Sequence, residues 1–162
     1  MEMSFKPEFS GTPAPTQGVI PHIVVDDARK AIEFYKAAFG ATEVMRAAMG
    51  DGSGRLMHAE LTLNGARFFL ADHFPEFCPA DREDVSGKAI GTLGPPKVLG
   101  GTGVTMHLYV ENCDAAVKRA ADAGAAVVME PWDAFWGDRY AQVADPFGHA
   151  WSFAHPLPAK AG

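Results

Sequence analysis

Two histidines in matching contexts are the first candidates for chemistry. His22 lies in the β-branched run Val19–Val25, and His107 lies in a second run of this kind, Val104–Val110. An imidazole exchanges protons near neutral pH and can also bind a metal ion. The pair can therefore serve as general acid and base, as polar residues that line a ligand cavity, or as half of a metal site.

Aromatic residues gather towards the C-terminus, where Trp132 and Trp136 flank Phe135. Their rings offer a broad apolar and π surface to a flat or cationic ligand. Arg139 follows, and its guanidinium can clamp a carboxylate or phosphate group. Other interpretations stay open: the rings can instead plug a barrel end or form a dimer contact, and Arg139 can instead pair with the neighbouring Asp138.

His58 and Glu60 form a third polar pair, and they alternate with Met57, Ala59 and Leu61. In a strand, this alternation puts the polar side chains on one face and the apolar ones on the other. The polar face can point into a cavity, where the pair would supply a general base, or outward into solvent. The pattern is that of a half-buried sheet, which favours the outward interpretation.

The elements that must position these residues fall into two series. Capping and turn signals define the first: Asp26 and Asp27 are N-cap candidates, Gly40 is a C-terminal glycine, and Asn64–Gly65 predicts a hairpin turn. The first series, residues 19–81, is predicted to contain a strand at Val19–Val25, a helix at Ala28–Phe39, and strands at Glu43–Ala48, Gly54–Leu63 and Ala66–Ala71.

The second series, residues 104–156, repeats this order. It is predicted to contain a strand at Val104–Val110, a helix at Cys113–Ala123, and strands at Ala126–Glu130, Tyr140–Ala144 and Ala150–Ala154. Between the two series, residues 82–103 are rich in Gly and Pro and lack periodicity, which predicts a connector that can act as a flap. We expect residues 1–18 to form a flexible N-terminal arm and residues 157–162 to form a tail.

Matching landmarks indicate an internal duplication. Val110 lies 85 residues after Val25, and Gly148 lies 83 residues after Gly65. A nearly constant spacing is the signature of a repeat. A unit that cannot bury its own sheet face must share a core with its twin. We therefore predict one structural domain of the α+β class, built from two βαβββ modules.

Charge and composition exclude several classes of protein. The formal net charge of the 162 residues is −6, which argues against nucleic acid as a partner because phosphate binding needs a basic surface. No apolar run approaches the roughly 20 residues of a membrane span, and residues 1–17 lack the apolar core of a signal peptide. Two cysteines, Cys78 and Cys113, fit a reduced cytoplasmic protein better than a disulfide scaffold.

The paired βαβββ order, the opening Val25–Gly40 and the closing Asp145-Pro-Phe-Gly148 resemble the vicinal oxygen chelate superfamily. This superfamily contains glyoxalase I, bleomycin- and fosfomycin-resistance proteins and extradiol dioxygenases. The stretch from Trp132 to Tyr140 is similar to its PhnB-like branch. The resemblance covers residues 19–155. It implies two modules whose curved sheets surround a cavity, the glyoxalase/bleomycin-resistance fold, and it implies a homodimer.

The resemblance also implies where a metal would bind. In metal-dependent members each module lends two His or Glu ligands, from its first and last strands, to a divalent ion that stabilises an enolate or oxyanion. The corresponding positions here hold Ile20, Thr105, Phe69 and Ser152, which are unable or poorly suited to bind a cation. We therefore expect no metal cofactor. The alternative is a shifted site for Zn, Ni, Mn or Fe, in which His22 and His107 recruit a carboxylate such as Glu60.

These observations favour a cytoplasmic protein that binds or sequesters an aromatic or apolar small molecule without a metal. The residues expected to contact the ligand are Ile20, Phe69, Tyr109, Trp132, Trp136, Arg139 and Ser152. The alternative is an enzyme related to glyoxalases or dioxygenases, acting as a lyase, isomerase or oxygenase. In that enzyme His22 and His107 would bind a metal ion or act as acid and base. A module used only for protein contacts would leave the cavity residues without a role.

Overall fold

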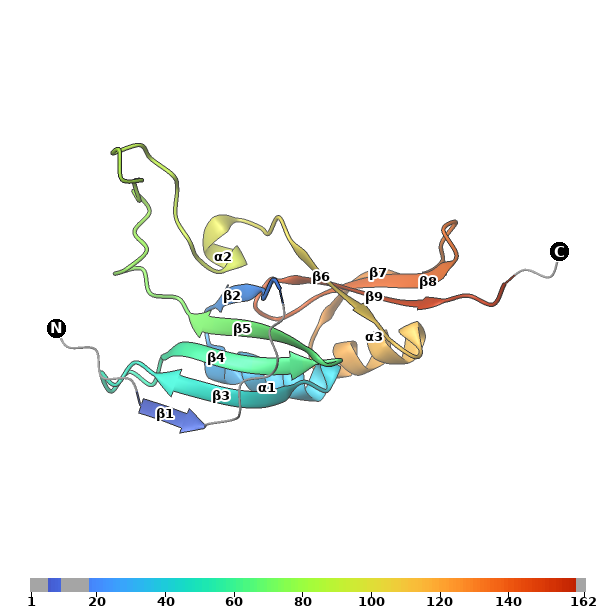
Figure 1. Cartoon of the computed structure of the whole chain (residues 1–162). Coiled ribbons are helices and arrows are strands. Elements are labelled where there is room, and N and C mark those ends of the chain that lie inside the picture. The colour runs from blue at the N-terminus through green and yellow to red at the C-terminus, as the bar shows by residue number, and fades with distance from the viewer. Residues whose placement is uncertain (1–5, 10–17, 160–162) are drawn as a thin grey trace.

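Two βαβββ modules form the molecule, as Figure 1 shows for the computed structural model, which describes residues 6–9 and 18–159. The first module consists of β2 (His22–Val25), α1 (Ala28–Phe39), β3 (Thr42–Ala48), β4 (Leu56–Leu63) and β5 (Ala66–Asp72). The second consists of β6 (Thr105–Tyr109), α3 (Cys113–Asp122), β7 (Ala126–Asp133), β8 (Asp138–Ala144) and β9 (Ala150–Pro156). The predicted α+β fold with two modules is confirmed.

The sheets of the two modules share one strand order. The first runs β3-β4-β5-β2 and the second β7-β8-β9-β6. In each, the first strand of the module is parallel to the last, and the other pairs are antiparallel. The sheets lie side by side, and α1 and α3, which pack against each other, cover one side of them (Figure 1). We call the sides opposite α1 and α3 the first and second open faces.

Part of the predicted N-terminal arm forms a strand instead. The strand β1 (Lys6–Phe9) pairs antiparallel with β3 and extends the first sheet to five strands. Pro7 lies opposite Ala47 in this pair, and an edge strand tolerates a residue that lacks an N–H donor. The predictions for the rest of the arm and for residues 160–162 lie outside the described residues.

Helix α1 follows directly from its sequence signals. The Asp27 carboxylate caps it by accepting a hydrogen bond from Lys30 N at 3.0 Å. Gly40 ends it with φ of 75°, a left-handed conformation that glycine adopts without strain. Ile32 and Tyr35 on its inner face are fully buried. With 12 residues it is the longest described helix, and no helix in residues 6–9 and 18–159 is long and apolar enough to cross a membrane.

One hydrophobic core joins the two modules, with a buried carboxylate at its centre. The hydroxyl of Tyr35 in α1 donates a hydrogen bond to Asp145 Oδ2 in the second module at 2.7 Å. The indole Nε1 of Trp151 donates to the same oxygen at 2.9 Å, and the backbone N–H groups of Phe147 and His149 donate to Oδ1. Because its oxygens are satisfied, this buried carboxylate fixes the turn that starts at Asp145 against the first module.

The connector is held at both ends. It contains a short helix, α2 (Pro96–Leu99), which packs on the last hairpin turn so closely that a Cβ at Gly148 would lie 2.9 Å from Pro96 Cβ. Nearby, Lys97 Nζ forms a 2.7 Å ion pair with Asp26. Just before the connector, the Arg55 guanidinium lies 4.4 Å from the centre of the Phe74 ring. The chain between these points runs out from the body of the protein (Figure 1).

Candidate functional site

The duplication places equivalent rows of side chains across the two open faces. In the first sheet, backbone pairing aligns Met45, Glu60, Phe69 and His22. In the second sheet, it aligns Met129, Gln142, Ser152 and His107. His22 and His107 therefore occupy equivalent positions, but they belong to different sheets and have different neighbours.

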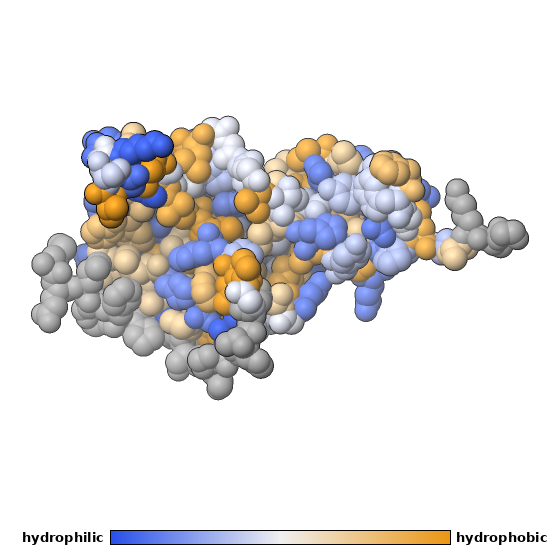
Figure 2. Space-filling model, turned by 45° about the horizontal axis from the view of Figure 1, so that its top comes forward, coloured by the Kyte–Doolittle hydropathy of each residue, from blue (hydrophilic) through white to orange (hydrophobic). Residues whose placement is uncertain are grey.

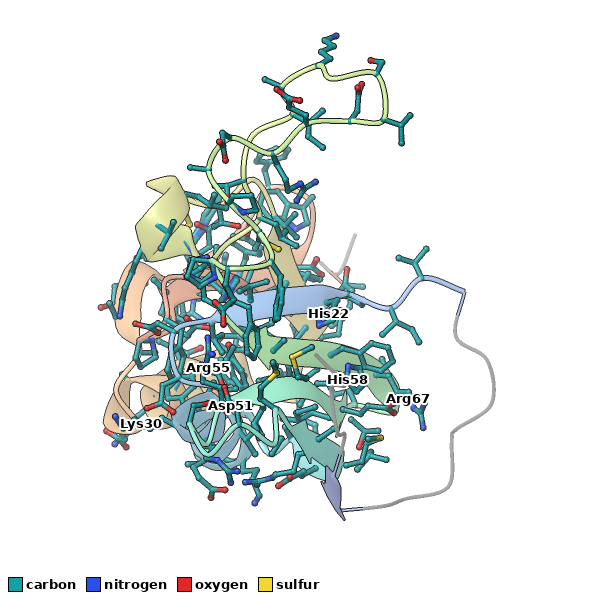
Figure 3. All side chains as sticks on the ribbon, turned by 90° about the vertical axis from the view of Figure 1, so that its left-hand side faces the viewer. His22, Lys30, Asp51, Arg55, His58 and Arg67 are labelled. Atoms are coloured by element: carbon teal, nitrogen blue, oxygen red, sulfur yellow. The ribbon has the colours of Figure 1, made fainter. Side chains whose placement is uncertain are left out.

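A carboxylate organises the first open face. Glu60 Oε1 lies 3.3 Å from His58 Nε2, and Glu60 Oε2 lies 3.1 Å from Arg67 Nη1. The three side chains are largely covered, with exposed fractions of 27% for His58, 15% for Glu60 and 9% for Arg67. Figure 3 shows His22, His58 and Arg67 on one side of the first sheet. The face thus carries a continuous chain of polar contacts from Arg67 to His58.

His22 stands at the end of this chain. Its ring lies edge-to-face with that of His58, with centroids 5.7 Å apart. Phe69 contacts both imidazoles, at 6.0 Å from His22 and 4.7 Å from His58. Partial burial lowers the pKa of His22, and the neighbouring His58 lowers it further. The lowered pKa favours the neutral imidazole, which keeps one nitrogen as a hydrogen-bond acceptor.

The structure matches the outward interpretation in part: His58 and Glu60 lie on the open face, but their side chains are largely covered and contact each other. Alternation separates the two faces of β4 correctly, but it does not reveal which face also carries His22. That depends on the register between β4, β5 and β2, which the spacing within one strand does not encode. The sequence gives no signal for Arg67, because a single arginine in a strand has no recognisable pattern. Its contact with Glu60 follows only from the register of β4 and β5, in which Thr62 lies opposite Arg67.

The second open face is organised around His107. Its Nδ1 lies 2.7 Å from the hydroxyl oxygen of Ser152. The Tyr109 ring contacts it edge-on at 4.9 Å, and the Tyr140 ring stacks on it at 6.2 Å. Gln142 Nε2 donates a hydrogen bond to the Tyr140 hydroxyl at 2.8 Å. Two of the predicted contact residues, Tyr109 and Ser152, therefore lie beside His107, and Tyr140 is an aromatic neighbour that the sequence reasoning missed.

The tryptophan cluster extends the same face. Trp132 and Trp136 lie edge-to-face with ring centroids 5.6 Å apart, and Trp136 lies 5.4 Å from Tyr140. The exposed fractions are 38% for Trp132, 49% for Trp136 and 93% for Phe135. Figure 2 shows hydrophobic residues interspersed with weakly polar ones at the end of the molecule that the β7–β8 hairpin forms. The cluster is thus an exposed aromatic surface continuous with the surroundings of His107.

Arg139 is engaged by two carboxylates. Its Nε and Nη2 donate to Asp114 at 2.6 and 2.8 Å, and its Nη1 donates to Asp133 at 2.8 Å. These hydrogen bonds hold the pKa of Asp114 below its ordinary value. Asp138, the neighbour considered from the sequence, instead accepts a hydrogen bond from Trp136 Nε1 at 3.1 Å. The guanidinium therefore serves to join α3 to the β7–β8 pair.

Some of the candidate residues line three separate cavities. The largest, about 630 Å³, lies between α1, α3 and the β4–β5 hairpin and includes Tyr109. The second, about 290 Å³, lies where the modules meet and includes Arg67 and His107. The third, also about 290 Å³, is the His22 cavity, and its other lining residues are Val24, Met57, Ala71, Asp72, His73, Phe74, Phe77, Cys78 and Leu93. None of the three is lined by Ile20, Phe69, Trp132, Trp136, Arg139 or Ser152.

The donor set does not fit the metal site that the resemblance implies. Phe69 presents a hydrocarbon ring, and the Ser152 hydroxyl is bonded to His107. Ile20 offers no donor, and Thr105 offers only a neutral hydroxyl. Across residues 6–9 and 18–159, no group of three or more His, Cys, Asp or Glu side chains is placed to hold a metal ion.

Comparison with known proteins identifies the family. Residues 19–153 match the model of the Glyoxalase/Bleomycin resistance protein/Dioxygenase superfamily, and the chain belongs to this superfamily. An uncharacterised protein of Mycobacterium tuberculosis is 47% identical over 137 residues, which cover 85% of this chain and 73% of the relative. The chain is thus a member of this superfamily, and this relative is itself uncharacterised.

Solved structures agree with the fold. A gene product from Arabidopsis thaliana is 30% identical with a TM-score of 0.58, and the match covers 87% of this chain and 100% of the other. TioX from Micromonospora sp. ML1 has a TM-score of 0.62 at 23% identity, covering 88% and 100%. A PhnB protein from Bacillus cereus has a TM-score of 0.58 at 16% identity, covering 88% and 100%. At these last two identities the likeness concerns the fold alone.

Proposed function

We propose that this protein binds a small aromatic or apolar molecule and does so without the divalent metal used by other members of its superfamily. The observation that carries the proposal is the His22 cavity. Phe74, Phe77 and Leu93 contribute apolar walls. His22, Asp72 and His73 supply polar groups. Such a combination of apolar walls and a few polar groups is typical of ligand sites, and about 290 Å³ suits a compact ligand.

The chemistry of the family's ligand positions supports binding without a metal. Phe69 contributes ring surface next to His22 and His58, which favours a flat ligand. On the second face, the Ser152 hydroxyl holds the His107 ring. Both positions thus favour recognition of an organic ligand over coordination of a cation.

The proposal includes a homodimer in the cytoplasm. Trp132, Phe135 and Trp136 form an exposed apolar surface of the kind that a second copy can cover. In such a dimer the aromatic residues of one copy would complete the ligand site. Cys78 and Cys113 are both free thiols, which supports a reducing compartment. Light scattering coupled to size-exclusion chromatography tests the dimer, and a monomer at all concentrations would contradict it.

A thermal-shift screen with planar aromatic compounds tests the binding function. A ligand at a hundred times its Kd stabilises the protein by about 2.7 kcal/mol, so a clear rise in Tm is expected. Phe77→Ala should reduce this rise, while Val85→Ala, which changes a fully exposed apolar residue that lines none of the three cavities, serves as the control. If no compound class raises the Tm, the proposed function is wrong.

Elemental analysis of protein purified without chelator tests the metal-free part of the proposal. We expect Zn, Ni, Mn and Fe well below one equivalent per chain. Stoichiometric metal that is lost in the His22→Ala and His107→Ala variants would instead support the shifted metal site.

A second candidate function is acid–base catalysis. The observation that favours it is that an imidazole on each open face is held at one nitrogen, His58 by Glu60 and His107 by Ser152. Such a contact fixes the orientation of an imidazole and leaves the other nitrogen for a substrate. This candidate would make the protein an isomerase or lyase.

A further inference from the structure

The polar chain on the first open face has the form of an activated base. Arg67 contacts Glu60, and Glu60 contacts His58 Nε2 at 3.3 Å. An ionised carboxylate can only accept a hydrogen bond, so Nε2 carries the proton. The lone pair of the ring then lies on Nδ1. A carboxylate behind an imidazole also stabilises the imidazolium that forms when Nδ1 takes up a proton.

The surroundings of His58 suit a proton acceptor. The ionisable groups in contact with the pair include His22 on β2 and Arg67 on β5. On β3, the residues paired with His58 and Glu60 are Ala47 and Met45, which carry no charge. The positive charge of Arg67 is met by Glu60. When His22 is neutral, it can form a hydrogen bond next to His58 without adding a second positive charge beside it.

The His22 cavity supplies the place for the rest of the ligand. His22 both lines this cavity and contacts His58. A ligand in the cavity reaches the polar chain only if a substituent extends past His22, and Phe69 flanks both imidazoles. His22 is thus the shared neighbour of the apolar pocket and of His58.

We propose that His58 is a base that takes the proton of a weakly acidic hydroxyl, a phenol or an enol, on a flat ligand bound in the His22 cavity. The ligand O–H bond breaks and its electron pair stays on oxygen, while a new N–H bond forms at His58 Nδ1. Glu60 is a positioning residue that keeps Nε2–H and stabilises the imidazolium. This inference rests on the proposed binding function and names the class of ligand.

The probe is 4-nitrophenol, whose ionised form absorbs at longer wavelength than the neutral form. At a pH where the free compound is mostly neutral, the wild-type protein should increase the ionised fraction. His58→Phe should abolish this change but retain binding, measured by thermal shift with the non-ionisable 4-nitroanisole. Glu60→Gln should lower the ionised-to-neutral ratio of the bound probe by about tenfold, which is one pKa unit. Asp122→Asn, which removes a carboxylate paired with Lys118 on α3, should have no effect.

The possible results separate this inference from the function on which it rests. Bound 4-nitrophenol that stays neutral in the wild type would overturn the inference and leave the binding function intact. Ionisation that survives in His58→Phe and is lost in His22→Phe would also overturn it, because His22 would then be the base. Binding of other flat compounds but not of 4-nitrophenol would reject the ligand class. The absence of binding by every compound would reject both proposals.

Discussion

His149 and Val24 connect the two modules through a side chain: His149 Nε2 lies 2.8 Å from the carbonyl oxygen of Val24. A similar contact runs from the first module to the second: Asn64 Nδ2 donates a hydrogen bond to the carbonyl oxygen of Tyr109 at 2.9 Å. Val24 and Tyr109 are equivalent residues of β2 and β6. Each module therefore uses its last hairpin turn to bond the first strand of the other, and we expect the two modules to depend on each other for folding.

The first prediction concerns this mutual dependence. His149→Ala removes a largely buried hydrogen bond and should lower the free energy of unfolding by about 0.5–1.5 kcal/mol. Urea denaturation followed by tryptophan fluorescence and by circular dichroism should give one coincident transition in the wild type and in the variant. Asn64→Gly removes the more exposed contact, and because glycine adopts the left-handed φ of 50° at this position without strain, it should have the smaller effect. Separate transitions for the two modules would contradict the shared core.

The second prediction compares two turn glycines. Gly148 has φ of +91°, and a Cβ there would lie 2.9 Å from Pro96 Cβ, whereas Gly65 has φ of +78° and a Cβ there would meet nothing within 4 Å. Each substitution by alanine incurs the left-handed backbone cost of about 1–2 kcal/mol. Gly148→Ala should destabilise by a further ~1–3 kcal/mol because of overpacking. Equal urea midpoints for the two variants would show that α2 does not pack tightly on the turn.

The third prediction concerns acid stability. The hydrogen bond from Arg46 lowers the pKa of Glu43 below its ordinary value of 4.5, although burial opposes this. A carboxylate whose pKa is lower in the folded protein stabilises it above pH 4.5, and this contribution disappears as the pH falls through the folded value. Glu43→Gln should therefore be less stable than the wild type at about pH 7, and the difference should shrink below about pH 4. A difference independent of pH would contradict this assignment.

The fourth prediction separates the two thiols. Burial raises the pKa of Cys113 to about 11, and the negative charge of Asp114 contributes. Its side chain is fully buried, whereas Cys78 is half-buried in the His22 cavity. Because the thiolate is the reactive form, a chromogenic disulfide at about pH 8 should label Cys78 first in the native protein. Cys78→Ser should remove the fast phase. A fast phase that persists in this variant would mean that Cys113 is accessible.

Local sequence signals were sufficient for most of the fold. Asp27 and Gly40 cap α1 as predicted. The Asn64–Gly65 turn has φ of 50° and 78°, as its residue types require. These features depend on short-range backbone preferences. The duplication was predictable because matching residues recur at a nearly constant spacing, which can be read from one sequence alone.

The candidate site needed information that short-range patterns do not contain. Glu60 meets Arg67 only because β4 and β5 pair in one register, and Arg139 meets Asp114 only because α3 packs beside β8. Alternation placed His22 and His107 at equivalent positions, but the side-by-side sheets put them among different neighbours. The strand β1 was missed because its pairing with β3 depends on contacts between segments far apart in the sequence.

The tethering of the connector at Phe74 and at Pro96 has a practical consequence for engineering. The chain between these anchors includes Val85, which is fully exposed, and a bridge between Glu83 and Ala89 closes the segment on itself. We expect a peptide grafted beside Val85 to extend into solvent without moving either sheet, because the segment is anchored on both sides. The segment is therefore a natural insertion point for a fluorophore or an affinity tag that reports on the protein without disturbing its histidines.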